Sequence, residues 1–460
     1  MSALEPAYAR PACAPRRITQ RRSAAFSWRH VLVVGALLAL TACAAPPPPA
    51  IAPPPPAPTR AWSAGAFADL RAAATAAPDE GLPAMDDVLA RLDRLDADSV
   101  HDAAAAQRFD AAADALFTRL ALGLAQGGAD PARADPEWAI ARAGAPDLAQ
   151  LRAAIAAAER PAALLRALAP QSGDYSVLAA ELARLRGEPG GADTQAQITS
   201  LRATLERWRW LPRDLPARRI EILTPHFILR FPGASPAEPE HAVIVGARAM
   251  ATPSFTAVIE SITLNPSWTP PDSIVRNELL PRFRRNPAAA AAEGFDAIDA
   301  AGVAADPAVI DWSERPFPYT LRQRPGPGNA LGRVRFDLPN PFAIYLHDTP
   351  SRGLFARADR ALSHGCIRVA DPVALAAAAS SDPAWSAGAL DAAIAEGSTQ
   401  TLTLPAPLPV YVLYMTARVG ADGAVSYADD IYDRDAAVVA ALDAPSPPQR
   451  ASAPHGGCGV

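Results

Sequence analysis

The sequence lacks lysine altogether, so all 43 of its basic residues are arginine. The 48 acidic residues outnumber them and leave a net charge of -5, with an isoelectric point of about 5.9. A nucleic-acid-binding protein is expected to show a basic excess, and its absence argues against nucleic acid as a partner. At 50% hydrophobic and 20% charged residues, the 460-residue chain is also too apolar to be mainly disordered, and its length suggests two or three domains.

Cysteine is scarce as well. The four cysteines are Cys13, Cys43, Cys366 and Cys458, and they are too scattered in a chain of this length to form a disulfide framework. We find no CxxC or HExxH pair, which disfavours a zinc site, and no Walker loop or strand–GxGxxG–helix unit, which disfavours a nucleotide-binding fold. The residues therefore imply no metal and no organic cofactor.

No apolar run reaches the 20 or so residues that a membrane-spanning helix needs. The longest such run near the N-terminus, 31–40, follows several arginines and is typical of a secretory signal. It leads into Leu-Thr-Ala-Cys43, which resembles a bacterial lipoprotein signal, so we expect residues 1–42 to be a signal peptide and Cys43 to be lipidated. Ala44, in place of aspartate, resembles the pattern sorted to the outer membrane, and a periplasmic location is expected. Ordinary secretion with Cys43 unmodified is the alternative.

Proline, with 49 residues, is concentrated in short stretches. Residues 43–60 contain two proline runs and predict an extended, semi-rigid linker. Residues 61–187 are rich in alanine, leucine and arginine, and the spacing of Leu89, Leu92 and Leu95 predicts one face of a helix. This part is expected to be a helical scaffold domain, followed by a linker and connecting helix at 188–215.

The pattern changes near residue 219, where short β-branched and aromatic runs begin. Short turns between them favour a mostly antiparallel or mixed sheet. We therefore predict an α+β fold, with a helical N-terminal domain, a β-rich catalytic domain at 216–440 and a disordered tail at 441–460. The expected strands are 219–223, 227–231, 242–246, 255–264, 332–336, 342–346, 401–404 and 410–414.

The residues suited to covalent chemistry lie between His347 and Cys366. A cysteine nucleophile reacts as the thiolate, and a histidine within hydrogen-bond reach, either His347 or His364, can remove the thiol proton. Gly365 permits a tight turn, whose backbone N–H groups can stabilise an oxyanion. Arg368 adds a positive charge that suits a carboxylate or pairs with a structural acid.

This arrangement resembles the active-site motif of the L,D-transpeptidases, whose catalytic domain is of the YkuD type. The hexapeptide Ser-His-Gly-Cys-Ile-Arg at 363–368, with His347 nineteen residues before the cysteine, carries the resemblance. Four further segments resemble the large YcbB-like branch of that family: 208–212, 265–271, 345–350 and 429–432.

The resemblance implies a reaction and a role for each motif residue. Cys366 would attack the carbonyl of the diaminopimelate residue in a peptidoglycan stem tetrapeptide, release D-alanine and form a thioester. An amine of a neighbouring stem would then resolve the thioester and give a 3→3 cross-link. His347 matches the general base and acid, and His364 matches the residue that orients the site and stabilises the intermediate.

The other motif residues match supporting roles. The backbone N–H groups of Gly365 and Cys366 are candidates for the oxyanion hole, and Ser363 belongs to the same turn. Arg368 matches a position that supports the loop or a substrate carboxylate, and Tyr345 is expected to face the cleft. Peptidoglycan stem peptides and, through the anchor at Cys43, a membrane are the implied partners.

Alternatives remain at this point. Cys366 also fits a buried structural thiol, and the same three side chains fit a zinc site, although no further ligand motif accompanies them. The acceptor that resolves the thioester is also open. Water would make the protein an L,D-carboxypeptidase or endopeptidase, and the lysine of an envelope lipoprotein would attach that lipoprotein to the wall. A catalytically idle lipoprotein that tethers the wall is the alternative of another class.

The branch is also known for a capping insertion before the catalytic histidine. Residues 281–327 occupy that place, and they contain Trp312, Phe317 and Tyr319. The alternative interpretation of this segment is a satellite hydrophobic cluster. Trp268 is expected to be a core residue, with a substrate platform as the alternative.

Overall fold

The structure is a computed structural model that describes residues 60–99, 102–158, 160–234 and 239–444. The expected signal peptide, Cys43, nearly all of the proline-rich linker and most of the predicted tail lie outside these residues. Among the helices within them, none is long and apolar enough to cross a membrane.

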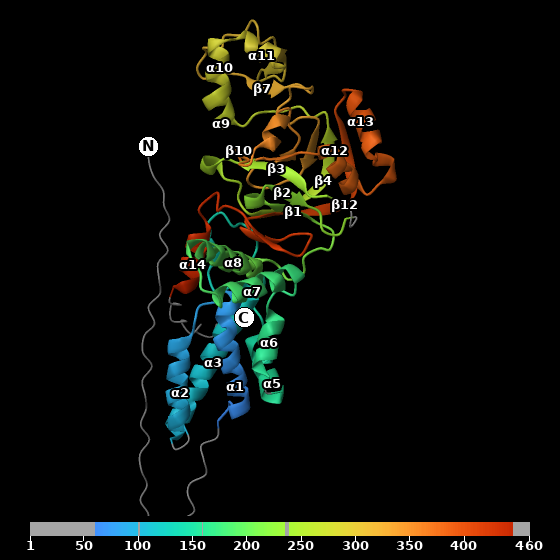
Figure 1. Ribbon diagram of the computed structural model, residues 1–460. Coiled ribbons are helices and arrows are strands. Elements are labelled where there is room, and N and C mark those ends of the chain that lie inside the picture. Colours follow the sequence, from blue (N-terminus) through green and yellow to red (C-terminus); the bar gives the residue numbers. More distant parts are fainter. Residues whose placement is uncertain (1–59, 100–101, 159, 235–238, 445–460) are drawn as a thin grey trace, which may run out of the picture. The chain divides into compact units, whose positions relative to one another are not determined.

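The N-terminal half is helical, as the sequence predicted, and it is drawn from blue to green in Figure 1. Its helices begin at residues suited to that position: the Asp102 side chain caps α3, and proline opens α4 and α6. Phe109 and Phe117 of α3 are buried at the centre of the scaffold core. The helices are α1 (Ala64–Ala76), α2 (Asp86–Ser99), α3 (Ala103–Gln126), α4 (Pro131–Ala134), α5 (Leu148–Ala158), α6 (Pro161–Leu168), α7 (Gly173–Arg186) and α8 (Ala192–Trp210).

Two elements outside the predicted scaffold boundaries belong to the scaffold core. Helix α8 lies in the stretch expected to link the domains, yet Leu201, Leu205 and Trp210 are fully buried among the scaffold helices. Helix α14 (Asp435–Asp443) follows the catalytic domain and packs against α8. The scaffold core is therefore completed by residues from both sides of the catalytic domain.

The C-terminal half contains a mixed sheet that closes on itself. Eight strands pair in the order β3-β11-β9-β8-β4-β12-β1-β2, and β2 pairs again with β3, while β10 adds to the same edge of β3. The α+β expectation and the mixed sheet are thus confirmed. The strands are β1 (Ile220–Leu223), β2 (Ile228–Arg230), β3 (His241–Gly246), β4 (Phe255–Leu264), β8 (Val334–Asp337), β9 (Leu346–His347), β10 (Ala361–Ser363), β11 (Ile367–Val369) and β12 (Gln400–Leu413).

Apolar side chains fill the interior of this barrel. Alternate residues of β4 are buried, and Ile259, Phe336 and Val410 from three adjacent strands are fully enclosed. Helices α12 (Pro372–Ser380) and α13 (Ala387–Ala395) add apolar residues to the same core, while the hairpin β13 (Ala417–Val419) and β14 (Val425–Tyr427) packs on the scaffold core. Short 3₁₀ helices lie at Ala77–Glu80, Thr224–His226, Arg248–Met250, Arg352–Ala356 and Pro383–Trp385.

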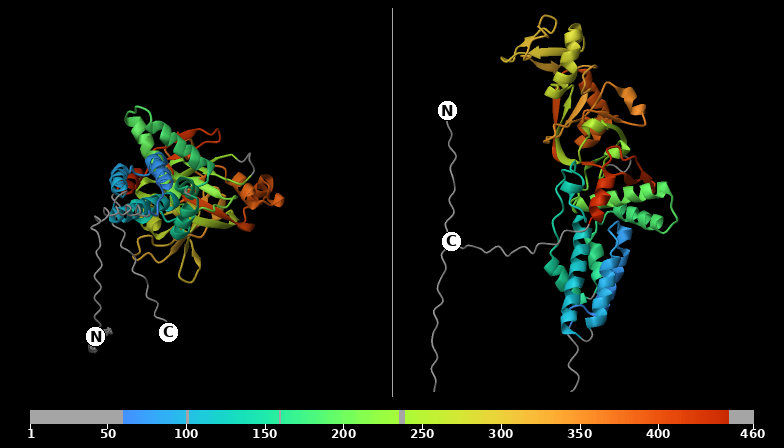
Figure 2. Two further views of the ribbon diagram at one scale, coloured as in Figure 1. Left: turned by 90° about the horizontal axis from the view of Figure 1, so that it is seen from below. Right: turned by 90° about the vertical axis from the view of Figure 1, so that its left-hand side faces the viewer.

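A separate small subdomain, the cap, is inserted between β4 and β8. It is the yellow-to-orange segment at the top of Figure 2, right. Its own core includes Phe283, Phe295 and Trp312, and its two ends meet where Trp268 and Gln323 exchange backbone hydrogen bonds of 2.9 and 2.7 Å. The cap therefore begins before residue 281. Its elements are α9 (Asp272–Ile274), the π-helical turn η4 (Val275–Leu279), α10 (Leu280–Arg285), α11 (Ala288–Ala292), β5 (Phe295–Ile298), β6 (Ala304–Ala305) and β7 (Thr320–Gln323).

A cluster of buried charges lies in the scaffold next to the barrel and reaches it through Arg434, which donates to the Ser254 hydroxyl at 3.2 Å. Arg207 of α8 contacts Asp435 at 2.5 Å and Asp135 at 3.2 Å, and all three side chains are at most 3% exposed. Arg434 contacts the same Asp135 carboxylate at 2.6 Å. Removing one partner of a buried pair leaves the other charge buried and unpaired. This junction is therefore expected to be rigid.

Candidate active site

Strands β9 and β11 run parallel and carry the site. Leu346 pairs with Ile367 and His347 with Arg368, and Leu346 and Ile367 are fully buried in the barrel core. Because successive side chains of a strand point to opposite faces, His347 and Arg368 share the face turned away from that core.

Tyr345 and Cys366 directly precede the two strands, and the same alternation, extended by one residue, puts them on the face of His347 and Arg368. The Tyr345 N–H donates to the Cys366 sulfur at 3.4 Å, and the sulfur lies 3.9 Å from the carbonyl oxygen of Ala343. Burial raises the pKa of the half-buried thiol, while the Tyr345 N–H and the Arg368 charge act in the opposite direction. The resting sulfur is therefore mainly a protonated thiol at neutral pH.

The loop before β9 is shaped by one side chain. The Asn340 amide group donates to the carbonyl oxygens of Leu338 and Ile344, at 2.7 and 2.8 Å. Its oxygen accepts the N–H groups of Phe342 and Ile344, at 3.0 and 3.2 Å. Ala343 is held at a φ of 53°, so the strand predicted at 342–346 begins only at Leu346. The loop presents its backbone to the sulfur as a result.

His347 is 4% exposed, and its backbone neighbours fix the ring. Nδ1 lies 2.5 Å from the carbonyl oxygen of Asp348. A carbonyl only accepts, so Nδ1 donates to Asp348, and the Leu331 backbone is a second hydrogen-bond partner of the ring. Burial, followed by the Arg368 charge, lowers the pKa of His347 from 6.5 to about 4, so the ring is neutral at pH 7. Among the described residues, no hydrogen bond joins this ring to Cys366.

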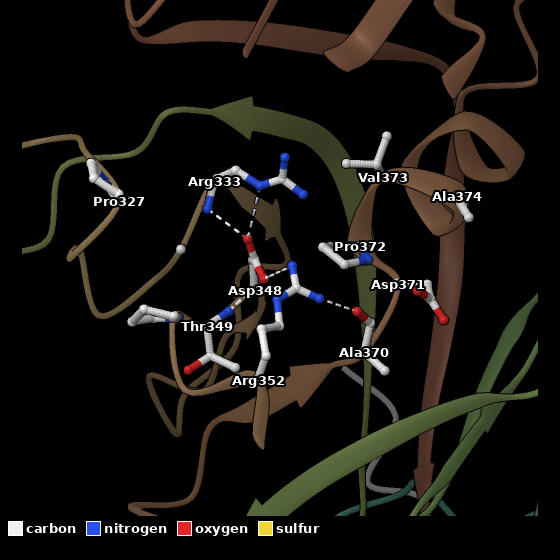
Figure 3. Close-up of a pocket in the computed structure, with 12 residues that line it drawn as sticks. Pro327, Arg333, Asp348, Thr349, Arg352, Ala370, Asp371, Pro372, Val373 and Ala374 are labelled. Carbon is white, nitrogen blue, oxygen red and sulfur yellow. Dashed lines mark hydrogen bonds and ion pairs between the residues drawn. The ribbon is translucent and has the colours of Figure 1, made fainter. Parts of the chain in front are cut away.

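The Asp348 side chain anchors the backbone that follows His347, as Figure 3 shows. Its carboxylate accepts the N–H groups of Arg333 and Thr349, at 2.8 and 2.6 Å, and contacts Arg352 at 2.5 Å. These groups line a cavity of about 340 Å³, which also borders Ala370. Ala370 follows β11 and Cys366 precedes it, so the Ala370 edge of the cavity lies about 13 Å along the extended backbone from Cys366.

Ser363 and Gly365 shape the turn that carries the sulfur. The Ser363 hydroxyl donates to the Cys366 carbonyl oxygen at 2.5 Å and accepts the Gly365 N–H at 3.1 Å. Gly365 has a φ of 107°, a conformation that favours glycine. A developing oxyanion would have to compete with Ser363 for the Gly365 N–H. For the Cys366 N–H, no acceptor is found within the described part of the chain.

Arg368 is half-buried and close enough to Cys366 for their charges to interact. Burial lowers the pKa of Arg368, and its Nε has no hydrogen-bond acceptor. In the described ranges no acid pairs with this guanidinium. The interpretation as a structural ion pair is thus not supported by these contacts, and the charge is available to the site.

His364 turns to the cap. Its Nε2 lies 2.5 Å from Oε1 of Glu278 in η4, and the two side chains are 37% and 51% exposed. Single π-helical turns inside helices are frequent at functional sites. No three His, Cys, Asp or Glu side chains of the described residues gather as metal ligands.

Two protein-family models match the chain in the order that the fold shows. Residues 58–182 match a scaffold domain, and residues 218–399 match the L,D-transpeptidase catalytic domain, YkuD. The C-terminal domain is an L,D-transpeptidase catalytic domain. A Haemophilus influenzae protein with the name "Putative L,D-transpeptidase" is 35% identical over 198 residues. That alignment covers 43% of this chain and 40% of the relative.

Some residues of this L,D-transpeptidase domain were not identified from the sequence. Asn340 had a signal, because asparagine before proline after a strand is typical of a structured turn. Asp348 lies in a segment that the family resemblance had marked. Glu278 had no local signal, because its contact with His364 spans 86 residues.

Proposed function

We propose that this chain is a peptidoglycan L,D-transpeptidase that forms 3→3 cross-links through a thioester on Cys366. The observation that carries the proposal is the placement of that sulfur: it lies at the start of β11, against the Tyr345 N–H, on the face that His347 and Arg368 share. The L,D-transpeptidase match of the surrounding domain supports the same reading.

The first half-reaction is the attack of Cys366 on the diaminopimelate carbonyl of a donor tetrapeptide. Because the resting thiol is protonated and His347 is neutral, the sulfur transfers its proton to the unprotonated ring nitrogen of His347 as the C–S bond forms. His347 then gives this proton to the departing nitrogen as the bond to D-alanine breaks. A thioester and free D-alanine result.

The second half-reaction repeats these steps in reverse with a new amine. The side-chain amine of a neighbouring diaminopimelate attacks the thioester and loses a proton to His347, and the Cys366 sulfur leaves and recovers that proton. Arg368 is assigned to holding a substrate carboxylate, since its charge interacts with Cys366 and its buried Nε has no acceptor. Tyr345 is assigned to the substrate-facing wall.

The turn residues have supporting assignments. The Cys366 N–H is the main donor to the oxyanion, with the Gly365 N–H as a second donor if it leaves Ser363. His364 is assigned to stabilising the intermediate and, through Glu278, to joining the turn to the cap.

The proposed location is the cell envelope, where peptidoglycan is found. It rests on the apolar run at 31–40 and on Cys43, the proposed site of lipid attachment. Labelling the host cells with a fatty-acid probe tests it. The wild-type chain is expected to take up the label and Cys43→Ser to lose it, and an unlabelled wild type would contradict the anchor.

The experiment that tests the reaction is incubation of the purified protein with disaccharide tetrapeptides, followed by separation of the products. Dimers joined by 3→3 cross-links are expected, and Cys366→Ala is expected to give none. Tripeptides alone would show that water is the acceptor. No product at all from a folded wild-type protein, together with binding to the wall, would favour the idle tether.

A further inference from the structure

A buried threonine forms a hydrogen bond to the turn that carries Cys366. Thr252 is 0% exposed, and its hydroxyl donates to the carbonyl oxygen of Gly365 at 2.8 Å. The Thr252 hydroxyl oxygen in turn accepts the N–H of Gly246, the last residue of β3, at 2.9 Å. A hydroxyl has only one proton to donate. Because the Thr252 oxygen accepts the Gly246 N–H, the Thr252 proton is directed to the Gly365 carbonyl oxygen.

The segment that contains Thr252 lies close to β3. A side chain at Gly246 would place Cβ 2.1 Å from the carbonyl oxygen of Met250, which no real structure tolerates. The absence of a side chain at Gly246 is therefore what allows the 250–252 backbone to lie beneath the turn.

Tyr432, from a third segment of the chain, forms hydrogen bonds with both Gly246 and Thr252. Its hydroxyl donates to the Gly246 carbonyl oxygen at 2.6 Å and accepts the Thr252 N–H at 3.4 Å. Its ring stacks on Tyr414, with centroids 5.5 Å apart, and the Tyr414 hydroxyl in turn accepts the Tyr432 N–H at 2.8 Å. Thr252 is thus held at both its hydroxyl and its backbone.

The scaffold forms backbone hydrogen bonds with the segment that contains Thr252, at Ser254. Ser254 donates its N–H to the Glu137 carbonyl oxygen at 2.8 Å and accepts the Ala139 N–H at 2.7 Å. The Ser254 hydroxyl also lies 3.2 Å from Arg434, which pairs with Asp135. Contacts from the scaffold thereby reach the segment that supports the nucleophile.

The consequence for the reaction follows from peptide geometry. The Gly365 carbonyl and the Cys366 N–H belong to one planar trans peptide unit, so they point in opposite directions. Fixing the carbonyl oxygen on a fully buried hydroxyl turns the Cys366 N–H away from the protein interior. Among the described residues, no acceptor was found for the Cys366 N–H, and this N–H is the group assigned above as the oxyanion donor.

We propose that Thr252 is a positioning residue for the nucleophile turn, which it holds so that the Cys366 N–H faces the developing oxyanion. Thr252 touches neither the sulfur nor the substrate in this arrangement. The inference rests on the proposed function in one respect, that Cys366 acts by acyl transfer.

The test compares Thr252→Val with the matched control Thr252→Ser, which keeps the hydroxyl. Two probes are used: p-nitrophenyl acetate, which acylates a thiol through an oxyanion, and iodoacetamide, which alkylates it without one. Loss of one oxyanion donor lowers kcat by about 10²–10³, and the valine variant is expected to lose about 10- to 100-fold in acetylation rate. Its alkylation rate is expected to change less than about threefold, and the serine variant is expected to keep both rates within about threefold.

Three outcomes would overturn the proposal: a valine variant that acetylates as fast as the wild type, equal losses with both probes, or no rescue by serine. If the valine variant does not fold, Tyr432→Phe provides the second test, and acetylation slowed more than alkylation is again required. Neither probe is derived from peptidoglycan. A wild type that reacts with both probes but not with tetrapeptides would therefore reject the proposed substrate and leave this test of Thr252 intact.

Discussion

The catalytic barrel is joined to two neighbours in contrasting ways. At the scaffold, Arg207, Asp135 and Arg434 form a buried cluster that contacts the barrel segment through Ser254. At the cap, the contact is the partly exposed pair of His364 with Glu278, and the cap has a hydrophobic core of its own. The comparison indicates that buried charges support the contact with the scaffold, whereas the nucleophile turn meets the cap through a partly exposed ion pair.

The largest expected effect is at the scaffold junction. Asp135→Asn leaves Arg207 and Arg434 buried with one carboxylate fewer, and the free energy of unfolding is expected to fall by about 3–5 kcal/mol. Urea unfolding followed by circular dichroism measures it. The matched control is Asp79→Asn, which removes an exposed pair with Arg186 and is expected to change stability by less than about 1 kcal/mol. A similar small change for both variants would contradict the contrast.

The next effect comes from the two histidines whose pKa values are lowered by burial. Burial lowers the pKa values of His347 and His226 from 6.5 to about 4, so the unfolded chain takes up protons before the folded chain does. Stability is therefore fully present above pH 6.5 and falls as the pH drops toward 4. Each ring is expected to remove about 1.4 kcal/mol for each pH unit in that window.

This effect is measured by urea unfolding at pH 7 and pH 5. His347→Gln is expected to lose about 2 kcal/mol less than the wild type between the two values. Identical acid sensitivity of the two proteins would show that His347 is not buried in its neutral form.

The smallest effect is at the cap junction. A double-mutant cycle of Glu278→Gln and His364→Gln is expected to give a coupling energy of about 0.3–1 kcal/mol, since both side chains are partly exposed. Urea unfolding of the four proteins measures it. A coupling above about 2 kcal/mol would place the cap junction on a level with the scaffold junction, and the comparison would then be wrong.

The sequence predicted the parts of the fold that depend on local pattern. The leucine spacing at 89–95 marked a helix, and the strands at 255–264 and 410–414 were visible as β-branched runs, because neighbouring residues decide these features. The motif from His347 to Cys366 predicted candidate site residues, and the structure pairs the two short strands, β9 and β11, on and beside which they lie.

The remainder depends on contacts that are remote in sequence. Arg207 bonds to Asp435 across 228 residues, so no local signal assigned α8 and α14 to one core. Thr252 appeared as an ordinary residue of a loop, although it meets Gly365 across 113 residues. The strand expected at 342–346 was shortened by the Asn340 side chain, whose hydrogen bonds outweigh the β propensity of Phe342 and Ile344.

The most direct test of the central claim is intact-mass spectrometry of the protein after brief incubation with a disaccharide tetrapeptide. The account predicts an adduct equal to the donor minus D-alanine, located on Cys366, sensitive to hydroxylamine and absent from Cys366→Ala. An adduct of the same mass on the alanine variant, or a folded wild type that never acquires one, would contradict it.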